Sequence, residues 1–185
     1  MKPKKLYKFL RTGLKSDNGK DRDWKIGEWR IEKDINICYR GFHASMTPLQ
    51  ALGYVPGEVL ALVEVKGESI IQEDKECWSE MRIIKAYQWE KKDSVALSIF
   101  AAELCIENYE KVYPNDPIPR NAIEAAERWL AEPTKGNESA AWSAAESAAE
   151  AAAWSAADSA AAADKLAKSL DAWFLKRIKT LKKYE

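Results

Sequence analysis

An alanine-rich run constrains the fold of this chain more than any other feature of its sequence. Residues 139–163 read SAAWSAAESAAEAAAWSAADSAAAA, without proline or glycine and with serines spaced by multiples of four. Alanine loses no side-chain entropy on becoming helical, so the run is expected to be helical on propensity alone. A period of four drifts slowly around a helix of 3.6 residues per turn. The run therefore predicts a closely packed helix from whose smooth surface Trp142 and Trp154 project.

The rest of the second half also has a helical pattern. Asp93 or Ser94 is expected to cap a helix that reaches about Tyr113, and Pro119 is expected to begin a second helix to residue 132. The alanine-rich run and its continuation add one or two more, so three or four antiparallel helices are predicted. The charged residues 90–92 mark the predicted boundary between two domains, 1–92 and 93–185.

The first half has strand-like patterns separated by turns. Residues 4–10 predict an opening strand, and residues 58–65 predict a central strand covered on both faces, because both sets of alternating positions are apolar. A turn is expected at Gly67 and a further strand at 81–89, and Thr47 followed by Pro48 predicts a short helix. The predicted fold class is α+β: an N-terminal mixed α+β domain followed by a C-terminal alanine-rich helical bundle.

Charge and cysteine content narrow the classes of partner. The chain carries 29 Lys and Arg against 29 Asp and Glu, yet residues 1–92 carry 18 against 14. This charge balance does not favour a nucleic-acid polymer as a partner, but the excess of cations in the first half is compatible with a basic pocket for a small anion. Three scattered cysteines and one histidine argue against a metal site, and neither a secretory leader nor a membrane span is apparent. We therefore expect a cytoplasmic protein with reduced thiols and no cofactor.

Cations, a histidine and a helix N-terminus occur together around one predicted strand–helix junction. A glycine before Phe42 and His43 allows close backbone approach, and the start of the helix offers amide groups to an anion. We expect a ligand pocket here and no catalytic residue, with His43 alternatively only capping the turn. The expected ligand-binding residues are Lys8, Arg11, Arg40, His43, Ser45 and Tyr54.

A wider set of residues in each half carries a resemblance to a known family. In the first half these are Tyr7-Lys8, Trp24 to Trp29, Cys38, Gly41 to Ser45, Pro48, Ala51-Leu52, Tyr54, Val63 to Val65, Gly67 and Asp74-Lys75. With them the first half resembles an uncharacterised domain of phages and prophages (GFHAS-type, DUF7666-like). In the second half, DPIPRNAIEAAERWLAE followed by the alanine-rich run resembles the helical Imm-5-like family of immunity proteins. The resemblance implies an accessory protein of a mobile element and implies no reaction.

Three functions are compatible with these patterns. The leading expectation is a phage-type accessory protein of counter-defence that binds and sequesters a small anionic, nucleotide-like ligand. If it is encoded by a phage, its expected location is the cytoplasm of the host cell. An alternative is an enzyme similar to ADP-ribosyltransferases that uses NAD, for which Arg11, Tyr54 and Glu76 or Glu80 would be the candidates. A third is a protein-interaction module, and the helical half is expected either to form a homo-oligomer or to be covered within the chain. Neither a Ser-His-Asp arrangement nor a phosphate-binding glycine motif is present.

Overall fold

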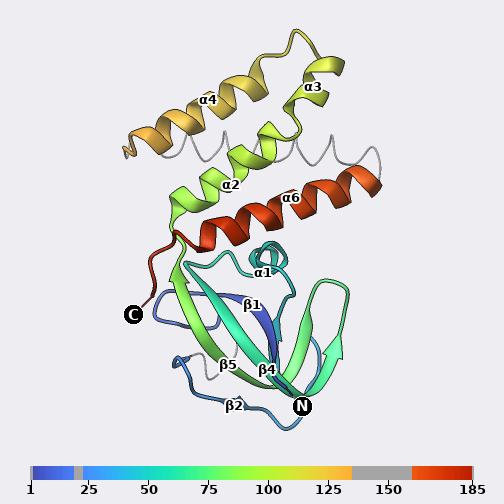
Figure 1. Ribbon diagram of the computed structural model, residues 1–185, viewed down its shortest axis with the longest axis vertical. Coiled ribbons are helices and arrows are strands. Elements are labelled where there is room, and N and C mark those ends of the chain that lie inside the picture. The colour runs from blue at the N-terminus through green and yellow to red at the C-terminus, as the bar shows by residue number, and fades with distance from the viewer. Residues whose placement is uncertain (1, 19–22, 135–159, 185) are drawn as a thin grey trace. The chain divides into compact units, whose positions relative to one another are not determined.

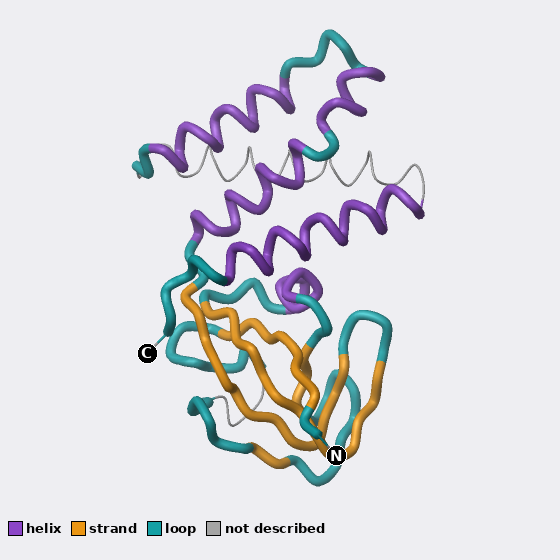
Figure 2. The backbone as a smooth tube through the Cα atoms, in the orientation of Figure 1, coloured by secondary structure: helices purple, strands orange, loops and turns teal. Residues whose placement is uncertain are grey.

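The computed structural model describes residues 2–18, 23–134 and 160–184, which form a mixed α+β protein (Figure 1). An antiparallel sheet occupies the N-terminal part, and the strands all lie there (Figure 2). The predicted fold class is confirmed. The chain divides into two compact units, Met1–Trp89 with Phe174–Glu185 and Glu90–Trp173. The predicted division into domains 1–92 and 93–185 stays a prediction.

The sheet closes on itself through short strand segments. Strand β1 (Lys4–Leu10) pairs with β4 (Val59–Ile71), which pairs with β5 (Glu76–Gln88), and all of these pairs are antiparallel. Strand β2 (Arg30–Ile31) and strand β3 (Phe42–Ala44) both pair with β5. Directly after β3, Ser45 exchanges two backbone hydrogen bonds with Tyr7 of β1. The succession of paired strands β1–β4–β5–β3 therefore leads back to β1, and these four strands form a closed ring.

Strand β4 is central and buried, as its sequence predicts. Val59, Ala61, Val63 and Val65 are all fully buried on one face, and Leu60 is fully buried on the other. The predicted strand 58–65 is confirmed, but it continues to Ile71.

The turn predicted at Gly67 is wrong, because this glycine forms a bulge within β4. Its φ is +85°, a Cβ there would lie 2.3 Å from Ser79 Oγ, and the pairing register shifts between Lys66 and Ser69. The hairpin turns instead after Ile71, where Gln72 N donates to Lys75 O over 2.9 Å. A glycine can therefore mark a bulge as readily as a turn.

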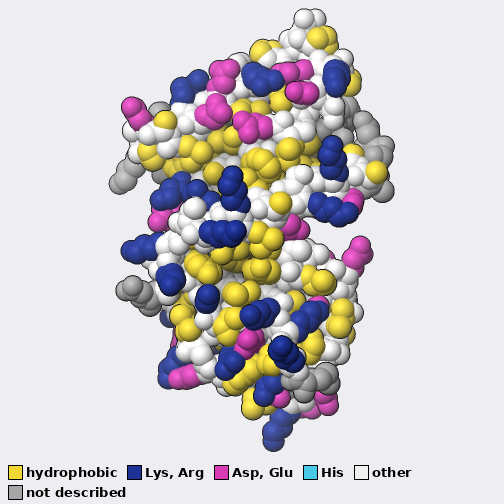
Figure 3. Space-filling view, viewed as in Figure 1, with side chains coloured by type: hydrophobic (Ala, Val, Ile, Leu, Met, Phe, Trp, Pro, Cys, Tyr) yellow, Lys and Arg dark blue, Asp and Glu magenta, His cyan; other side chains and the backbone are white. Residues whose placement is uncertain are grey.

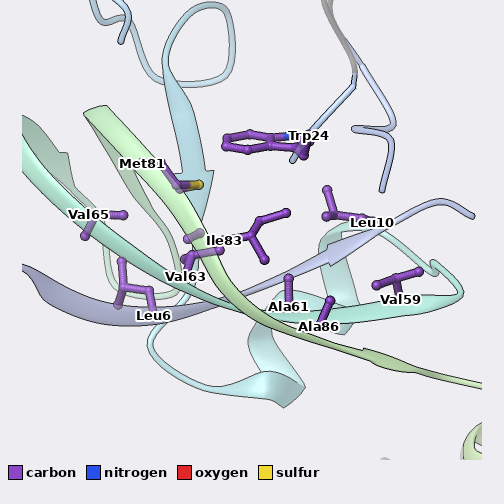
Figure 4. Packing of buried hydrophobic residues seen from close by; sticks show 11 residues of the cluster. Leu6, Leu10, Trp24, Val59, Ala61, Val63, Val65, Met81, Ile83 and Ala86 are labelled. Atoms are coloured by element: carbon purple, nitrogen blue, oxygen red, sulfur yellow. The ribbon is translucent and has the colours of Figure 1, made fainter. Parts of the chain in front are cut away.

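One face of the sheet holds the core of the N-terminal unit. Leu6 and Leu10 of β1 pack there with the valines of β4, with Met81 and Ile83 of β5, and with Trp24 from the loop before β2 (Figure 4). Burial of such apolar side chains contributes about 25 cal/mol per Å² and is the main stabilising term. The positions of β1 that alternate with Leu6 and Leu10 point to the opposite face.

That opposite face is lined by aromatic rings, one of them from the C-terminal segment. Phe9 meets Trp89 edge to face at 5.6 Å, and Trp89 stacks on Phe174 at 4.9 Å. Farther along, Tyr184 N donates to Ala86 O over 2.9 Å. The sequence pattern assigned the end of the chain to the helical half and did not predict its packing in this unit.

Helix α1 (Pro48–Tyr54) begins as its sequence predicts. The Thr47 side chain accepts from Gln50 N, and the Gln50 side chain accepts from Thr47 N, which makes a complete capping box. Pro48 occupies the first helical turn, where its missing N–H costs nothing. The helix packs against β1 and follows directly from the β3 segment.

The second unit contains only helices and the loops between them among its described residues. It comprises α2 (Lys91–Glu103), α3 (Ile106–Val112), α4 (Ile118–Ala131) and most of α6 (Ala160–Ile178). Helices α2 and α4 pack together around a buried cluster that includes Val95, Ile99, Ile123, Ala126 and Trp129.

Two predictions about these helices are wrong in detail. Glu90 is the N-cap of α2 and forms a capping box with Asp93, so Asp93 lies inside the first turn and does not cap the helix. The helix expected to reach Tyr113 is interrupted after Glu103, where Cys105 N donates to Ala102 O in a tighter, i to i−3 pattern.

Most of the alanine-rich run, with Trp142 and Trp154, lies outside the described residues, and α6 begins at the end of this run. No helix among the described residues is both long and apolar enough to cross a membrane.

Candidate functional site

Lys8 lies on the buried face of β1, at an unusual place for a charged side chain. It stands between Leu6 and Leu10, which are 1% and 0% exposed, and is itself only partly exposed. Its Nζ donates a hydrogen bond of 2.9 Å to the backbone carbonyl of His43. The lysine therefore joins β1 to β3 at the position where the ring of strands closes.

The single histidine, His43, lies beside Lys8 on β3. Its Nε2 accepts a hydrogen bond of 3.0 Å from Cys38 N, so the neutral ring carries its proton on Nδ1. Burial lowers the pKa of His43, and the charges of Lys8 and Lys75 lower it further. The ring is thus held neutral by two nearby cations and by its partial burial.

A second cation near Lys8 is Arg30 of β2. Burial and then Arg30 lower the pKa of Lys8 to about 8. The Arg30 guanidinium lies over the rings of Trp24 at 4.6 Å and Phe42 at 5.4 Å, which meet edge to face. Cation–π contacts of this kind hold the guanidinium in place. Aromatic surface and positive charge therefore occur together at this point of the unit.

Lys75, from the turn between β4 and β5, completes the cluster. Its Nζ lies 3.1 Å from Cys38 Sγ and 4.8 Å from the centre of the Tyr54 ring. The Tyr54 hydroxyl donates to the Asp74 carboxylate, and this bond raises the pKa of Tyr54. These contacts tie the end of α1 to the hairpin turn. We call Lys8, Arg30, His43 and Lys75 the cation cluster.

Close packing of Gly41 against Cys77 fixes the segment that carries His43. Gly41 has φ +108°, and a Cβ there would lie 2.5 Å from Cys77 Sγ. The Cys77 thiol donates to Arg40 O over 3.3 Å, and burial raises its pKa. Cys77 also faces His43 across the β3–β5 pair. The glycine is therefore required by both its backbone angle and the space available.

The six predicted ligand residues do not all meet. Lys8 and His43 are in contact, and Tyr54 reaches the cluster through Lys75. Ser45 is buried and its backbone bridges to Tyr7.

The two predicted arginines have other partners. Arg40 is exposed, and its side chain approaches the Asp34 carboxylate at 3.5 Å. Arg11 follows β1, about 10 Å along an extended chain from Lys8. Its side chain donates to Asp17 at 2.7 Å and to Pro56 O at 2.9 Å. The structure does not bring Arg11 into the cation cluster, and a role for it in binding stays a prediction.

The candidate residues of a transferase are also apart. Glu76 is buried and bonds to Lys4 and to Trp78 Nε1, whereas Glu80 pairs with Lys66 at 3.0 Å. Lys4 and Arg11 lie seven residues apart across β1, which is about 23 Å for an extended strand. Glu76 and Arg11 are thus held toward different ends of this strand.

Arg30, Lys75, Cys38 and Cys77 were not among the predicted site residues. Lys75 stands within a stretch whose acidic side chains dominate the pattern, and Arg30 lies in a two-residue strand with little sequence signal. Arg30 comes near Lys8, and Lys75 near His43, only through long-range pairing with β5 or the turn before it. Among the described residues, no group of three or more His, Cys, Asp or Glu side chains could hold a metal ion.

Comparison with known proteins concerns the same part of the chain. Residues 4–93 match the model of a family described as a domain of unknown function, DUF7666. No curated protein and no solved structure matches the chain. The matched residues include every member of the cation cluster.

Proposed function

We propose that the N-terminal unit binds a small phosphate-bearing ligand, of the nucleotide class, at the cation cluster and holds it without converting it. The observation that carries this proposal is the convergence of cations where β3 returns to β1: Lys8 bonds to His43 O, burial and Arg30 lower the pKa of Lys8, and burial, Lys8 and Lys75 lower the pKa of His43. An anion placed among these groups would raise both pKa values, because an opposite charge favours the protonated form. Binding would therefore relieve a cost that the free protein carries.

The surroundings of the cluster support a ligand that has both charge and an aromatic part. Charge-assisted hydrogen bonds from Lys and Arg suit phosphate oxygens. The rings of Trp24, Phe42 and Tyr54 adjoin the same cations and offer stacking surface for a base. Figure 3 shows one face of the molecule, on which Lys and Arg side chains lie among hydrophobic ones in the N-terminal unit. Sequestration of a signalling nucleotide would be the counter-defence role that the likeness to phage domains implies.

Calorimetric titration with pyrophosphate and a panel of linear and cyclic nucleotides tests the proposal. Lys8→Met and Lys75→Met should each weaken binding about 10- to 100-fold, since a charge-assisted bond contributes about 1.5–3 kcal/mol. Lys66→Met is the matched control, because Lys66 also lies over an aromatic ring, that of Trp29 at 4.5 Å, but pairs with Glu80. It should leave affinity unchanged.

The fate of the ligand separates the proposal from the rival functions. Ligand recovered intact from the denatured protein agrees with sequestration. Nicotinamide released from NAD, or a modified acceptor protein, would instead identify a transferase. Absence of binding across the panel would refute the proposal and leave the protein-interaction reading.

A further inference from the structure

Residues 182–184 add a further strand to the sheet of the N-terminal unit. Gln88 N donates to Lys182 O over 2.8 Å, within β5 at its last residue. Two positions away, Tyr184 N donates to Ala86 O over 2.9 Å. Strand β4 pairs with β5 along its other edge at these positions. The C-terminal segment therefore belongs to the sheet, although the whole helical unit separates it from β5 in sequence.

Tyr184 is held in this unit by its side chain as well as by its backbone. Its ring packs against the hydrophobic core, and its hydroxyl accepts a hydrogen bond of 2.7 Å from Gly13 N. Gly13 and Leu14, with φ of +80° and +56°, form a tight turn that two hydrogen bonds between Arg11 and Lys15 close. Leucine rarely adopts a left-handed conformation, so a turn of this shape needs stabilising contacts from outside itself. The Tyr184 hydroxyl supplies one of them.

The same turn holds Trp24 in place. Trp24 N donates to Leu14 O over 3.0 Å, and Trp24 Nε1 donates to Ser16 Oγ over 2.7 Å. Both the backbone and the indole of Trp24 are thus bonded to the residues that follow Gly13. The guanidinium of Arg30 lies over the Trp24 ring, 4.6 Å from its centre. Contacts therefore lead from the Tyr184 hydroxyl, through this turn and the Trp24 ring, to a member of the cation cluster.

We infer that Tyr184 is a positioning residue for the cation cluster. Its hydroxyl fixes the turn at Gly13, the turn fixes the Trp24 ring, and the ring fixes the guanidinium of Arg30. Tyr184 lies 171 positions from Gly13 along the chain and outside the residues that match the family model. The positioning concerns the free protein, whereas its effect on anion affinity rests on the proposed function.

NMR of the full chain without ligand tests the positioning. Tyr184→Phe removes the hydroxyl and keeps the ring and the backbone pairing. The Gly13 amide should then exchange with solvent at least about tenfold faster, because it loses its acceptor. The Trp24 indole N–H signal and the ring-shifted side-chain signals of Arg30 should move, while the Gln88 amide should stay protected by Lys182 O. Unchanged signals of Gly13, Trp24 and Arg30 would overturn the inference.

A double-mutant cycle on pyrophosphate affinity separates positioning from general stabilisation. Tyr184→Phe should weaken pyrophosphate binding about 3- to 10-fold in the native background. In an Arg30→Met background the same substitution should change affinity less than about twofold, because the group that Tyr184 positions is absent. Tyr87→Phe is the matched control, since it removes a hydroxyl from the residue of β5 that faces Lys183, and it should change neither affinity nor the NMR signals.

The two readouts distinguish this inference from the proposed function. Equal losses of affinity from Tyr184→Phe in the native and Arg30→Met backgrounds would overturn the inference and leave the anion site intact. If the native chain does not bind pyrophosphate, the proposed anion site is refuted. The signals of Gly13, Trp24 and Arg30 in the free protein then decide alone whether Tyr184 positions Arg30.

Discussion

Gly41→Ala is expected to destabilise the N-terminal unit strongly, for two separable reasons. The residue has φ +108°, outside the range that L side chains readily adopt, which costs about 1–3 kcal/mol. The new Cβ would also lie 2.5 Å from Cys77 Sγ and 3.1 Å from Ile35 Cγ2, so the packing must shift, at a further cost of about 1–3 kcal/mol. Together these give a loss of about 4 kcal/mol, a large share of the 5–15 kcal/mol typical of a whole domain.

Urea denaturation followed by tryptophan fluorescence measures this loss, and a double-mutant cycle with Cys77→Ala separates its parts. Cys77→Ala should remove the part of the cost that comes from Sγ, and leave the backbone part and the contact with Ile35. Gly53→Ala is the control, because Gly53 lies within α1 with no atom within 4 Å of its added Cβ. It should stabilise by about 0.5–1 kcal/mol. If Gly41→Ala is as harmless to stability as Gly53→Ala, the packing described for residues 41–45 is refuted.

Two further predictions concern one residue in each unit. The pKa of Lys8 is lowered to about 8 in the fold, so between about pH 8 and 10.5 the unfolded chain binds more protons. From pH 7 to pH 10 the free energy of unfolding of the native protein should therefore rise by about 2 kcal/mol relative to that of Lys8→Met, as measured by urea denaturation. If the difference in unfolding free energy between the two proteins does not change with pH, the lowered pKa of Lys8 is contradicted. Ala126→Leu, at a fully buried position of α4, should cost about 1–3 kcal/mol by thermal unfolding, whereas Glu127→Leu at an exposed position should cost far less.

Local signals predicted the elements that local interactions decide. The opening strand at 4–10, the cap at Thr47 and the buried character of residues 58–65 each follow from a short pattern, and the structure confirms them. Gly67 was misread because a positive φ serves a turn and a bulge equally well. Only the pairing partner, Ser79 on β5, distinguishes the two.

The candidate site could be predicted only in part for the same physical reason. Lys8 and His43 were identified by residue type near one junction, and the return of the sheet from β3 to β1 brings them into contact. Arg30 and Lys75 join them through pairing with β5 and its turn, over separations in sequence that no local pattern encodes. Arg11 has the right chemistry, but it is directed toward Asp17 and Pro56. Charge type alone therefore does not place a side chain in a site.

Because the chain has one histidine, proton NMR of His43 tests the central claim most directly. In the free protein its pKa should lie below the ordinary value of about 6.5, since burial and the charges of Lys8 and Lys75 disfavour the imidazolium. Saturating pyrophosphate should raise that pKa, whereas sodium chloride of equal ionic strength should not, and Lys66→Met should behave as the native chain does. A His43 pKa that pyrophosphate leaves unchanged would contradict the assignment of the cation cluster as an anion-binding site.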